Sequence, residues 1–213
     1  MFKITTIFVS LLVFISLSAC DFSNDPIIPE KPKVNIISGK VQAYTGTEAT
    51  LEAHLTVDFF QEGAKVGQGS LKADGSFTVT LNDTVADENL EPLSDPCAGV
   101  TITPSTFKGA GILFLSVVKD GKPIGELLQA SSATVFSDPS GKLVARIYVD
   151  QDASILGTCQ NQSNSTFNVN YKKGWNLELA ELEAASSTDS TIESSDLPWF
   201  YSSTEQPSIV KSF

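Results

Sequence analysis

The sequence predicts an all-β protein whose strands form an antiparallel β-sandwich. Apolar and polar residues alternate with a period of two through most of the chain after residue 34. Turn sequences rich in Gly, Asp and Pro separate these short alternating runs. No apolar stripe with helical spacing and useful length occurs after the first 20 residues. We therefore expect about ten to twelve short strands.

The run from Leu51 to Phe59 is the clearest single strand. Its odd positions are apolar and its even positions are polar, which is typical of a strand with one buried face. The only histidine of the chain, His54, falls on the polar face, so we expect its side chain to be exposed.

A β-hairpin is predicted between Ala64 and Leu81. The tripeptide Ala73-Asp74-Gly75 separates two alternating runs, and Asp-Gly in that position is a strong hairpin signal. Together with Ser38-Gly39-Lys40-Val41, this segment resembles the small prealbumin-like sandwich modules of secreted bacterial proteins. The resemblance implies a sandwich of that type, and an immunoglobulin-like sandwich is the alternative.

The middle of the chain contains a polar loop and then a strand that we expect to be buried on both faces. The proline-containing loop near residues 82–98 is the best candidate for an internal boundary, which would divide the fold into two small stacked β modules. Residues 111–118 are apolar on both alternating faces, which favours a central strand. The turn Lys119-Asp120-Gly121-Lys122 then leads into another strand over residues 123–128.

Alternation continues towards the C-terminus. One run places Leu143, Ala145, Ile147 and Val149 in alternation with Val144, Arg146, Tyr148 and Asp150. Trp175 alternates in phase with Leu177 and Leu179, so we expect it to fill the core. Residues 198–202 are predicted to form a last edge strand.

The N-terminal residues 1–19 have the three parts of a secretory signal peptide. Lys3 supplies a positive charge, residues 7–17 form an apolar segment, and the small residues Ser18 and Ala19 precede Cys20. The apolar segment is shorter than the roughly 20 residues that a membrane-spanning helix needs.

The ending Leu17-Ser18-Ala19-Cys20 resembles the lipobox of bacterial lipoproteins. The resemblance implies that the Cys20 sulfur receives a diacylglycerol and that signal peptidase II cuts before Cys20. It also implies that the new amine is acylated, typically with palmitate. Two or three acyl chains anchor a protein stably, whereas one binds only marginally. The alternative is an ordinary signal peptide in which Cys20 is incidental.

Residues 20–33 are expected to be the lipidated cysteine and a flexible tether, since three prolines block both helix formation and strand pairing. The β-sandwich domain is predicted over residues 34–205, followed by a C-terminal tail at 206–213. The membrane would thus be one partner, with the domain outside the cytoplasm of a bacterial cell.

The charge balance excludes one class of partner. The formal net charge is −11, or −12 once Lys3 is removed with the signal peptide, and Arg146 is the only arginine. Nucleic-acid binding needs clustered Lys and Arg, so we exclude it.

The cysteines form a pair once Cys20 is set aside. Cys97 and Cys159 are 62 positions apart, and an even number in an oxidising compartment favours a disulfide. Two reduced buried thiols or one reactive cysteine are the alternatives.

Little in the sequence indicates catalysis, so we predict no enzyme, no cofactor and no metal ion. Any Ser/His or Cys/His chemistry would have to use His54. The pair in Asp150-Gln151-Asp152 offers oxygen ligands for calcium, but it lacks the spacing of an EF-hand-like loop, and a solvated turn is the alternative.

Three consecutive aromatic residues, Trp199, Phe200 and Tyr201, are the candidate ligand or partner surface. They cannot all face inward on a strand. We therefore expect a non-enzymatic, membrane-anchored envelope lipoprotein with a structural or protein-binding role. A carbohydrate- or small-ligand-binding module that uses these aromatics is the alternative.

Overall fold

The computed structural model describes residues 35–57, 61–92, 97–135, 140–159 and 164–203, all within the compact unit Pro32–Phe213. Cys20 and the tether lie outside the described residues. The described part is all-β, as predicted, and its only helical element is the short 3-10 turn Asp87–Asn89. None of the described helices has the length and apolarity required to cross a membrane.

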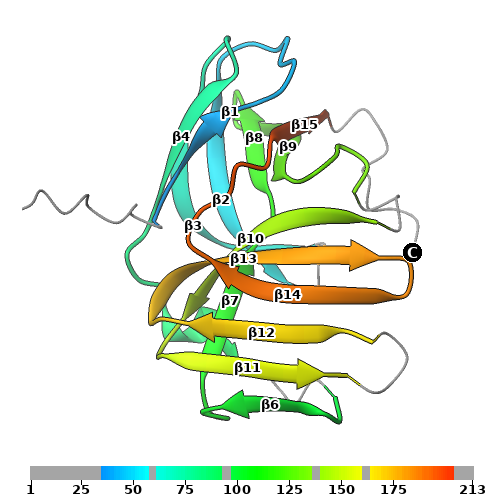
Figure 1. The fold of residues 1–213 in the computed structure, drawn as a ribbon. Coiled ribbons are helices and arrows are strands. Elements are labelled where there is room, and N and C mark those ends of the chain that lie inside the picture. Colours follow the sequence, from blue (N-terminus) through cyan, green and yellow to red (C-terminus); the bar gives the residue numbers. More distant parts are fainter. Residues whose placement is uncertain (1–34, 58–60, 93–96, 136–139, 160–163, 204–213) are drawn as a thin grey trace, which may run out of the picture. The chain divides into compact units, whose positions relative to one another are not determined.

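Fifteen strands join into one mixed sheet that is not closed (Figure 1). In chain order they are β1 (Ile36–Lys40), β2 (Ala49–Val57), β3 (Gln61–Leu71), β4 (Ser76–Leu81), β5 (Glu91–Pro92), β6 (Val100–Thr103), β7 (Lys108–Ile112), β8 (Leu115–Lys119), β9 (Lys122–Gln129), β10 (Gly141–Val149), β11 (Ala153–Thr158), β12 (Thr166–Tyr171), β13 (Gly174–Glu183), β14 (Ser186–Ile192) and β15 (Trp199–Ser203).

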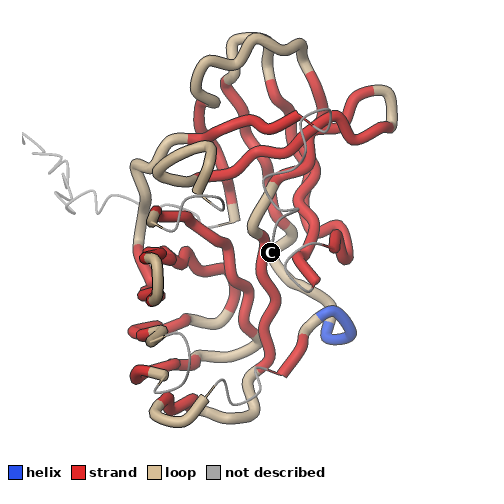
Figure 2. The backbone as a smooth tube through the Cα atoms, turned by 90° about the vertical axis from the view of Figure 1, so that its right-hand side faces the viewer, coloured by secondary structure: helices blue, strands red, loops and turns tan. Residues whose placement is uncertain are grey.

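The main path across the sheet is β1-β4-β3-β2-β7-β10-β13-β14-β12-β11-β6. Beside this path β8 pairs with β2 and β9, β15 pairs with β9, and β5 pairs with β7. The strands β13, β14, β12, β11 and β6 form the stack in the lower half of Figure 1, which Figure 2 views nearly end on. All-β structure is thus confirmed, whereas the division into the two separate sheets of a sandwich is not.

The alternation in β2 produces the buried face that the sequence predicts. Leu51, Ala53 and Leu55 are all buried. The prediction of an exposed His54 is wrong, because its side chain keeps only 18% of its accessible surface. The β2–β3 register shifts on both sides of His54, and this irregularity places the ring between Glu52 and the backbone of Gly63.

Both predicted hairpins are confirmed. In the β3–β4 turn, Asp74 Oδ1 accepts a hydrogen bond from the Ser76 backbone N at 2.9 Å, and Gly75 adopts a φ of 82°. In the β8–β9 turn, Asp120 and Gly121 have φ values of 52° and 73°. Two consecutive positive φ angles match the twist of the flanking strands, which explains the Asp-Gly sequence.

The predicted central strand over residues 111–118 is divided into β7 and β8. Both pieces pair with β2, but their other partners differ: β7 also pairs with β10 and β5, whereas β8 also pairs with β9. At the break, the Leu113 backbone N donates to Thr56 Oγ1 at 3.2 Å. Local apolarity predicts the burial of this stretch but cannot reveal that its first half also joins β10 while its second half also joins β9.

The largest core cluster connects distant parts of the chain. It contains residues of β1 to β4, β8 and β9 together with Tyr148 of β10, Trp175 of β13 and Trp199 of β15. Trp175 fills the core as expected, and its Nε1 donates to the Asn82 carbonyl at 2.8 Å. A second cluster surrounds Phe107, and its buried members are Phe107, Val149, Ala153, Ile155, Val169 and Tyr171.

Strand β10 is covered on both faces. Val144, Arg146 and Tyr148 are buried on one face, while Leu143 and Val149 are buried on the other. This double coverage is what brings the only arginine into the interior.

The predicted disulfide is confirmed. Cys97 and Cys159 are bonded, with their Cα atoms 5.5 Å apart. The bond ties the segment before β6 to the residue after β11, two strands that also pair directly.

Candidate functional site

The three C-terminal aromatic residues differ in their surroundings. Trp199 is only 5% exposed and belongs to the core, so it is the ring of the three that faces inward. Phe200 and Tyr201 are half-buried. The Tyr201 hydroxyl donates to the Ile124 carbonyl at 2.9 Å, and its ring meets that of Tyr44 edge to face at 5.5 Å.

Trp199 lies between another aromatic ring and a buried cation. The Phe77 ring is nearly perpendicular to it, at 82°, with the centroids 5.0 Å apart. The Arg146 Cζ atom stands 5.2 Å from the centre of the Trp199 ring, within the range of a cation–π interaction. Arg146 is itself only 8% exposed.

Gln129, which is 4% exposed, completes this group. Its amide nitrogen donates to the Leu197 carbonyl at 3.1 Å, so its amide oxygen faces the guanidinium. Arg146 Nη2 donates to that oxygen at 2.8 Å. We call Arg146, Gln129 and Trp199 the Arg146 cluster; it joins β10, β9 and β15.

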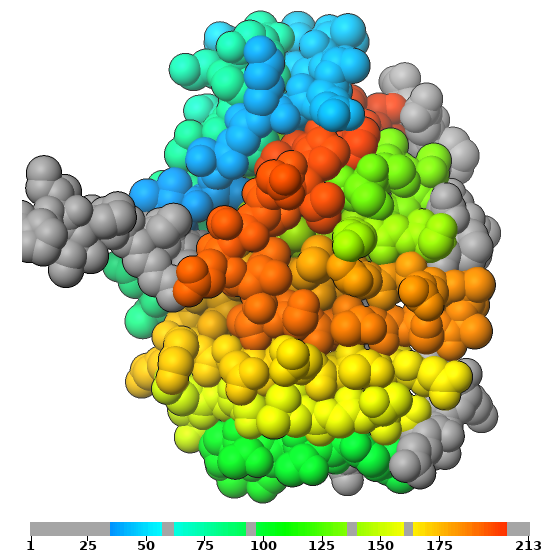
Figure 3. Space-filling view, in the orientation of Figure 1, coloured from blue at the N-terminus to red at the C-terminus, as the bar shows by residue number. Residues whose placement is uncertain are grey.

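The chain between β14 and β15 adjoins the Arg146 cluster. Figure 3 shows this segment, orange to red, crossing the visible face between β1 and β9. Within it, the Leu197 carbonyl holds Gln129, and the Pro198 carbonyl accepts a hydrogen bond from the Ala130 N at 3.1 Å.

The charge of Arg146 has no carboxylate partner among the described residues. Its one side-chain hydrogen bond goes to the neutral amide of Gln129. Its cross-strand neighbours on the same sheet face are the apolar residues Ile112 and Leu177. Burial alone lowers the pKa of Arg146 to about 10. A buried guanidinium without a counter-charge is unfavourable for folding, because its desolvation is not repaid by ion pairing.

No protein-family model, curated protein or solved structure matches this chain. The chemistry of its own residues is therefore the basis for assigning a site.

Strands β10 and β13 pair with each other, and the sheet face opposite Arg146 carries acidic groups. Glu178 on β13 pairs with Ala145 and so points away from Arg146. The Tyr171 hydroxyl donates to Glu178 Oε2. Burial raises the pKa of Glu178 to about 7 and that of Asp189 on β14 to about 6, and the charge of Asp189 adds to the shift of Glu178.

A serine and the histidine occur on neighbouring strands, but each has another partner. His54 Nε2 and Glu52 Oε2 are 3.2 Å apart, and His54 Nδ1 lies 3.2 Å from the Gly63 carbonyl. The buried Ser116 hydroxyl donates to Glu62 Oε1. The base and the nucleophile of a hydrolase would bond to each other. Here His54 contacts Glu52, and Ser116 is bonded to Glu62 instead of to the histidine.

The acidic turn after β10 uses its carboxylates to hold the backbone. Asp150 Oδ1 accepts from the Lys108 N at 2.9 Å, and Asp152 Oδ1 accepts from the Lys173 N at 2.9 Å. Asp152 Oδ2 also pairs with Lys172 Nζ at 2.8 Å. Within the described ranges, no group of three or more His, Cys, Asp or Glu side chains is arranged to hold a metal ion.

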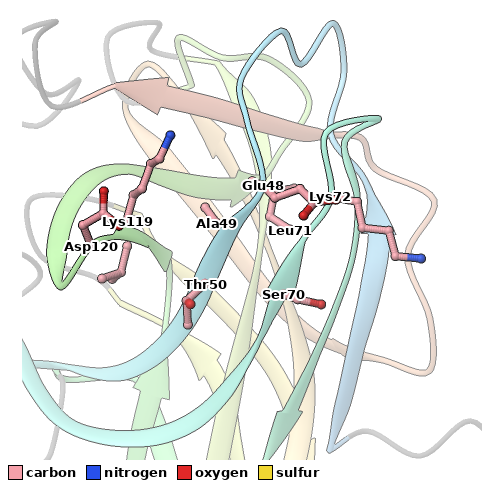
Figure 4. A pocket seen from close by; sticks show the side chains of 9 residues that line it. Glu48, Ala49, Thr50, Ser70, Leu71, Lys72, Lys119 and Asp120 are labelled. Carbon is pink, nitrogen blue, oxygen red and sulfur yellow. The ribbon is translucent and has the colours of Figure 1, made fainter.

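An open depression of 520 Å³ lies at one end of β2, β3 and β8 (Figure 4). The charged residues on its walls are Glu48, Lys72, Lys119 and Asp120. Figure 4 shows the side chains of Lys72 and Lys119 extending in different directions. Ligand sites usually combine an enclosed apolar pocket with polar groups that converge on one point. This depression has no such convergence, and the Arg146 cluster is the stronger candidate.

Sequence reasoning singled out Trp199 but missed Arg146 and Gln129. The count of one arginine in a chain of net charge −11 was the available signal. That count cannot predict burial, which depends on the covering of both faces of β10.

Proposed function

We propose that this protein is a lipid-anchored protein of the bacterial cell envelope that binds another protein and catalyses no reaction. The lipobox-like ending at Cys20, followed by the proline-containing tether, supports the anchor. The engagement of Ser116 and His54 with separate carboxylates supports a binding role over hydrolysis.

The anchor is tested by fractionating cells that express the wild-type protein or Cys20→Ser. We expect wild-type protein in the membrane fraction, and an N-terminal peptide whose mass includes a diacylglycerol and an acyl chain. Cys20→Ser should lose both properties. Asp21→Ser is the matched control, because it changes the next residue and keeps the thiol. An unmodified Cys20 in the wild-type protein would contradict the anchor.

The free edge of β6 is the surface that best supports protein binding. Strand β6 ends the sheet and pairs only with β11 among the described strands. Beside it, Leu156 is one of two exposed large hydrophobic side chains in the described part, at 43% exposure, and it pairs with Thr101. An exposed edge offers backbone groups to an added strand, and an adjacent apolar side chain adds contact area.

Site-specific photocrosslinking in cells tests this surface. A photoreactive residue at Leu156 should capture one defined envelope protein, and so should one at Thr101. The exposed Thr78 on β4 is the matched control and should not capture it. Identical crosslinked products from Thr78 and Leu156, or no product from Leu156, would exclude this edge as the protein-binding surface.

A second candidate function is carbohydrate binding by Phe200 and Tyr201. The half-buried, edge-to-face Tyr44–Tyr201 pair favours it, since sugars stack on partly exposed aromatic faces. Tryptophan fluorescence measured during glycan titration should then change for the wild type and not for Tyr201→Ala.

The scaffold behind these surfaces is proposed to pack in the manner of a β-sandwich. One core cluster combines Val79 of β4 and Leu51 of β2 with Tyr148 and Trp175 from β10 and β13, which supports face-to-face packing within the continuous sheet.

A further inference from the structure

The guanidinium of Arg146 has unused hydrogen-bond donors. A guanidinium carries five N–H groups in a planar fork, and Gln129 accepts from one nitrogen, Nη2. Every fully buried side-chain nitrogen or oxygen of the described residues has a hydrogen-bond partner. The guanidinium nitrogens that do not reach Gln129 therefore lie within the 8% of Arg146 that remains accessible.

The surroundings of the guanidinium fix its position. Arg146 Cζ lies 5.2 Å from the centre of the Trp199 ring, and Nη2 is bonded to Gln129, which is held in turn by the Leu197 carbonyl. A planar cation whose orientation is fixed before binding loses little entropy when it accepts an anion. The same contacts leave its positive charge without a described counter-ion.

We propose that Arg146 binds the carboxylate group of a small organic acid or of a peptide C-terminus. The carboxylate accepts from the guanidinium N–H groups that Gln129 leaves free, and it supplies the missing negative charge. This site is independent of the free edge of β6 and of the lipid anchor.

The charge of the site and an apolar neighbour favour a carboxylate over a phosphate or sulfate. The cluster offers one cation, so a monoanion neutralises it, whereas a dianion would leave one negative charge buried. Leu177, the cross-strand neighbour of Arg146 on β13, is apolar and half-buried, which suits the hydrocarbon part of an organic acid.

The test is a titration of the full mature chain in nonionic detergent, followed by tryptophan fluorescence. The Trp175→Phe background makes Trp199 the only tryptophan. Acetate, benzoate and an N-acetyl dipeptide with a free C-terminus are the probes, and sodium chloride keeps the ionic strength constant. Phosphate, sulfate and the same dipeptide as its C-terminal amide are the comparison arms.

We expect a saturable fluorescence change with the carboxylates and none with the amide. A response to the dipeptide but not to acetate or benzoate would identify a peptide C-terminus, and the opposite pattern would identify a free organic acid. A stronger response to phosphate or sulfate than to any carboxylate would overturn the proposal.

Two variants connect the response to Arg146. Arg146→Met should remove it, and Arg146→Lys should weaken it about tenfold or more, because a single ammonium cannot form the two-point contact. Lys142→Met, which removes an exposed charge from the same strand, should respond as the parent does. An undiminished fluorescence response in Arg146→Met would overturn the proposal. The absence of a saturable response in the parent protein would also overturn it, and this outcome does not depend on whether the variants fold.

Discussion

The two faces of the β10–β13 strand pair hold opposite charges, and they differ in how those charges are satisfied. One face carries Arg146, a permanent cation beside a neutral amide and an indole ring. The other face carries Glu178, which accepts a hydrogen bond from Tyr171 and becomes neutral when it binds a proton. Arg146 and Glu178 belong to adjacent strands but point to opposite sides of the sheet.

The comparison shows two responses to the same physical problem. A carboxyl group avoids the cost of burial by raising its pKa, whereas a guanidinium stays charged at any physiological pH. Only the acidic face can therefore relieve its charge through pH. On the basic face, only a bound anion would neutralise the charge, and this is the physical reason for proposing the carboxylate site.

The largest expected effect comes from reversing the charge on the basic face. Arg146→Glu should lower the free energy of unfolding by about 3–5 kcal/mol, because it places an unpaired carboxylate against the Trp199 ring. Arg146→Met should stay within about 1 kcal/mol of the wild type, since it removes a costly buried charge together with its contacts. Urea unfolding measures the free energy of unfolding of both variants. An equal loss of stability in Arg146→Met and Arg146→Glu would mean that the guanidinium is mainly structural.

The acidic face should make stability depend on pH. The folded-state pKa of Glu178 is about 7, above its ordinary value of 4.5, and Asp189 rises from 3.8 to about 6. The folded protein therefore binds protons more tightly than the unfolded chain, and stability falls as pH rises through about 4 to 7. We expect a melting temperature roughly 5 °C higher at pH 5 than at pH 8.

Glu178→Gln is the matched variant for this pH dependence. It keeps a hydrogen-bond acceptor for Tyr171 and cannot ionise, so the difference between pH 5 and pH 8 should shrink. The lowered pKa values of Glu52, Asp74 and Asp152 act in the opposite direction only at more acidic pH. If Glu178→Gln kept the full pH dependence of the wild type, groups other than Glu178 would be its cause.

A smaller effect is expected from crowding the Trp199 ring. A Cβ atom at Gly39 would lie 2.8 Å from Trp199 Cδ1 and 3.1 Å from Phe77 Cε1. Gly39→Ala should therefore cost about 1–3 kcal/mol and change the Trp199 fluorescence. The neighbouring exposed Ser38→Ala should be neutral. Because the disturbance lies on the basic face, the pH dependence due to Glu178 should persist in Gly39→Ala; its loss would show that the two faces are coupled.

The smallest effect is expected at the surface of the same strand pair. Lys142 and Glu181 form an ion pair between two exposed side chains, in direct register across β10 and β13. Lys142→Met should change the free energy of unfolding by less than about 0.5 kcal/mol. Thermal unfolding measures the change. A larger loss of stability in Lys142→Met would mean that exposed charges contribute to the stability of this sheet as much as buried charges do.

Local signals predicted much of the fold. The alternation that buries Leu51 and Leu55, the two Asp-Gly turns and the Cys97–Cys159 bond are all present, because each depends on residues or chemistry visible in the sequence. The order of the strands depends on pairings between distant segments, so the single continuous sheet and the break between β7 and β8 could not be predicted.

The candidate site was predicted only in part, for the same reason. The run of three aromatic residues drew attention to Trp199 as part of a surface. Its burial against Arg146 depends on the pairing of β15 with β9, which the sequence does not reveal. Period-two alternation predicts that Arg146 and Glu178 occupy opposite faces only once the β10–β13 register is known.

The pKa of the Glu178 carboxyl, measured by NMR titration in the wild type and in Arg146→Met, tests most directly whether the two faces are separate. We predict a value of about 7 in the wild type, raised by burial. The same value in Arg146→Met, within about 0.3 of a pH unit, would show that the guanidinium leaves Glu178 unaffected, since the sheet separates the two charges. A wild-type value near 4.5, or a further rise on losing Arg146, would contradict this account.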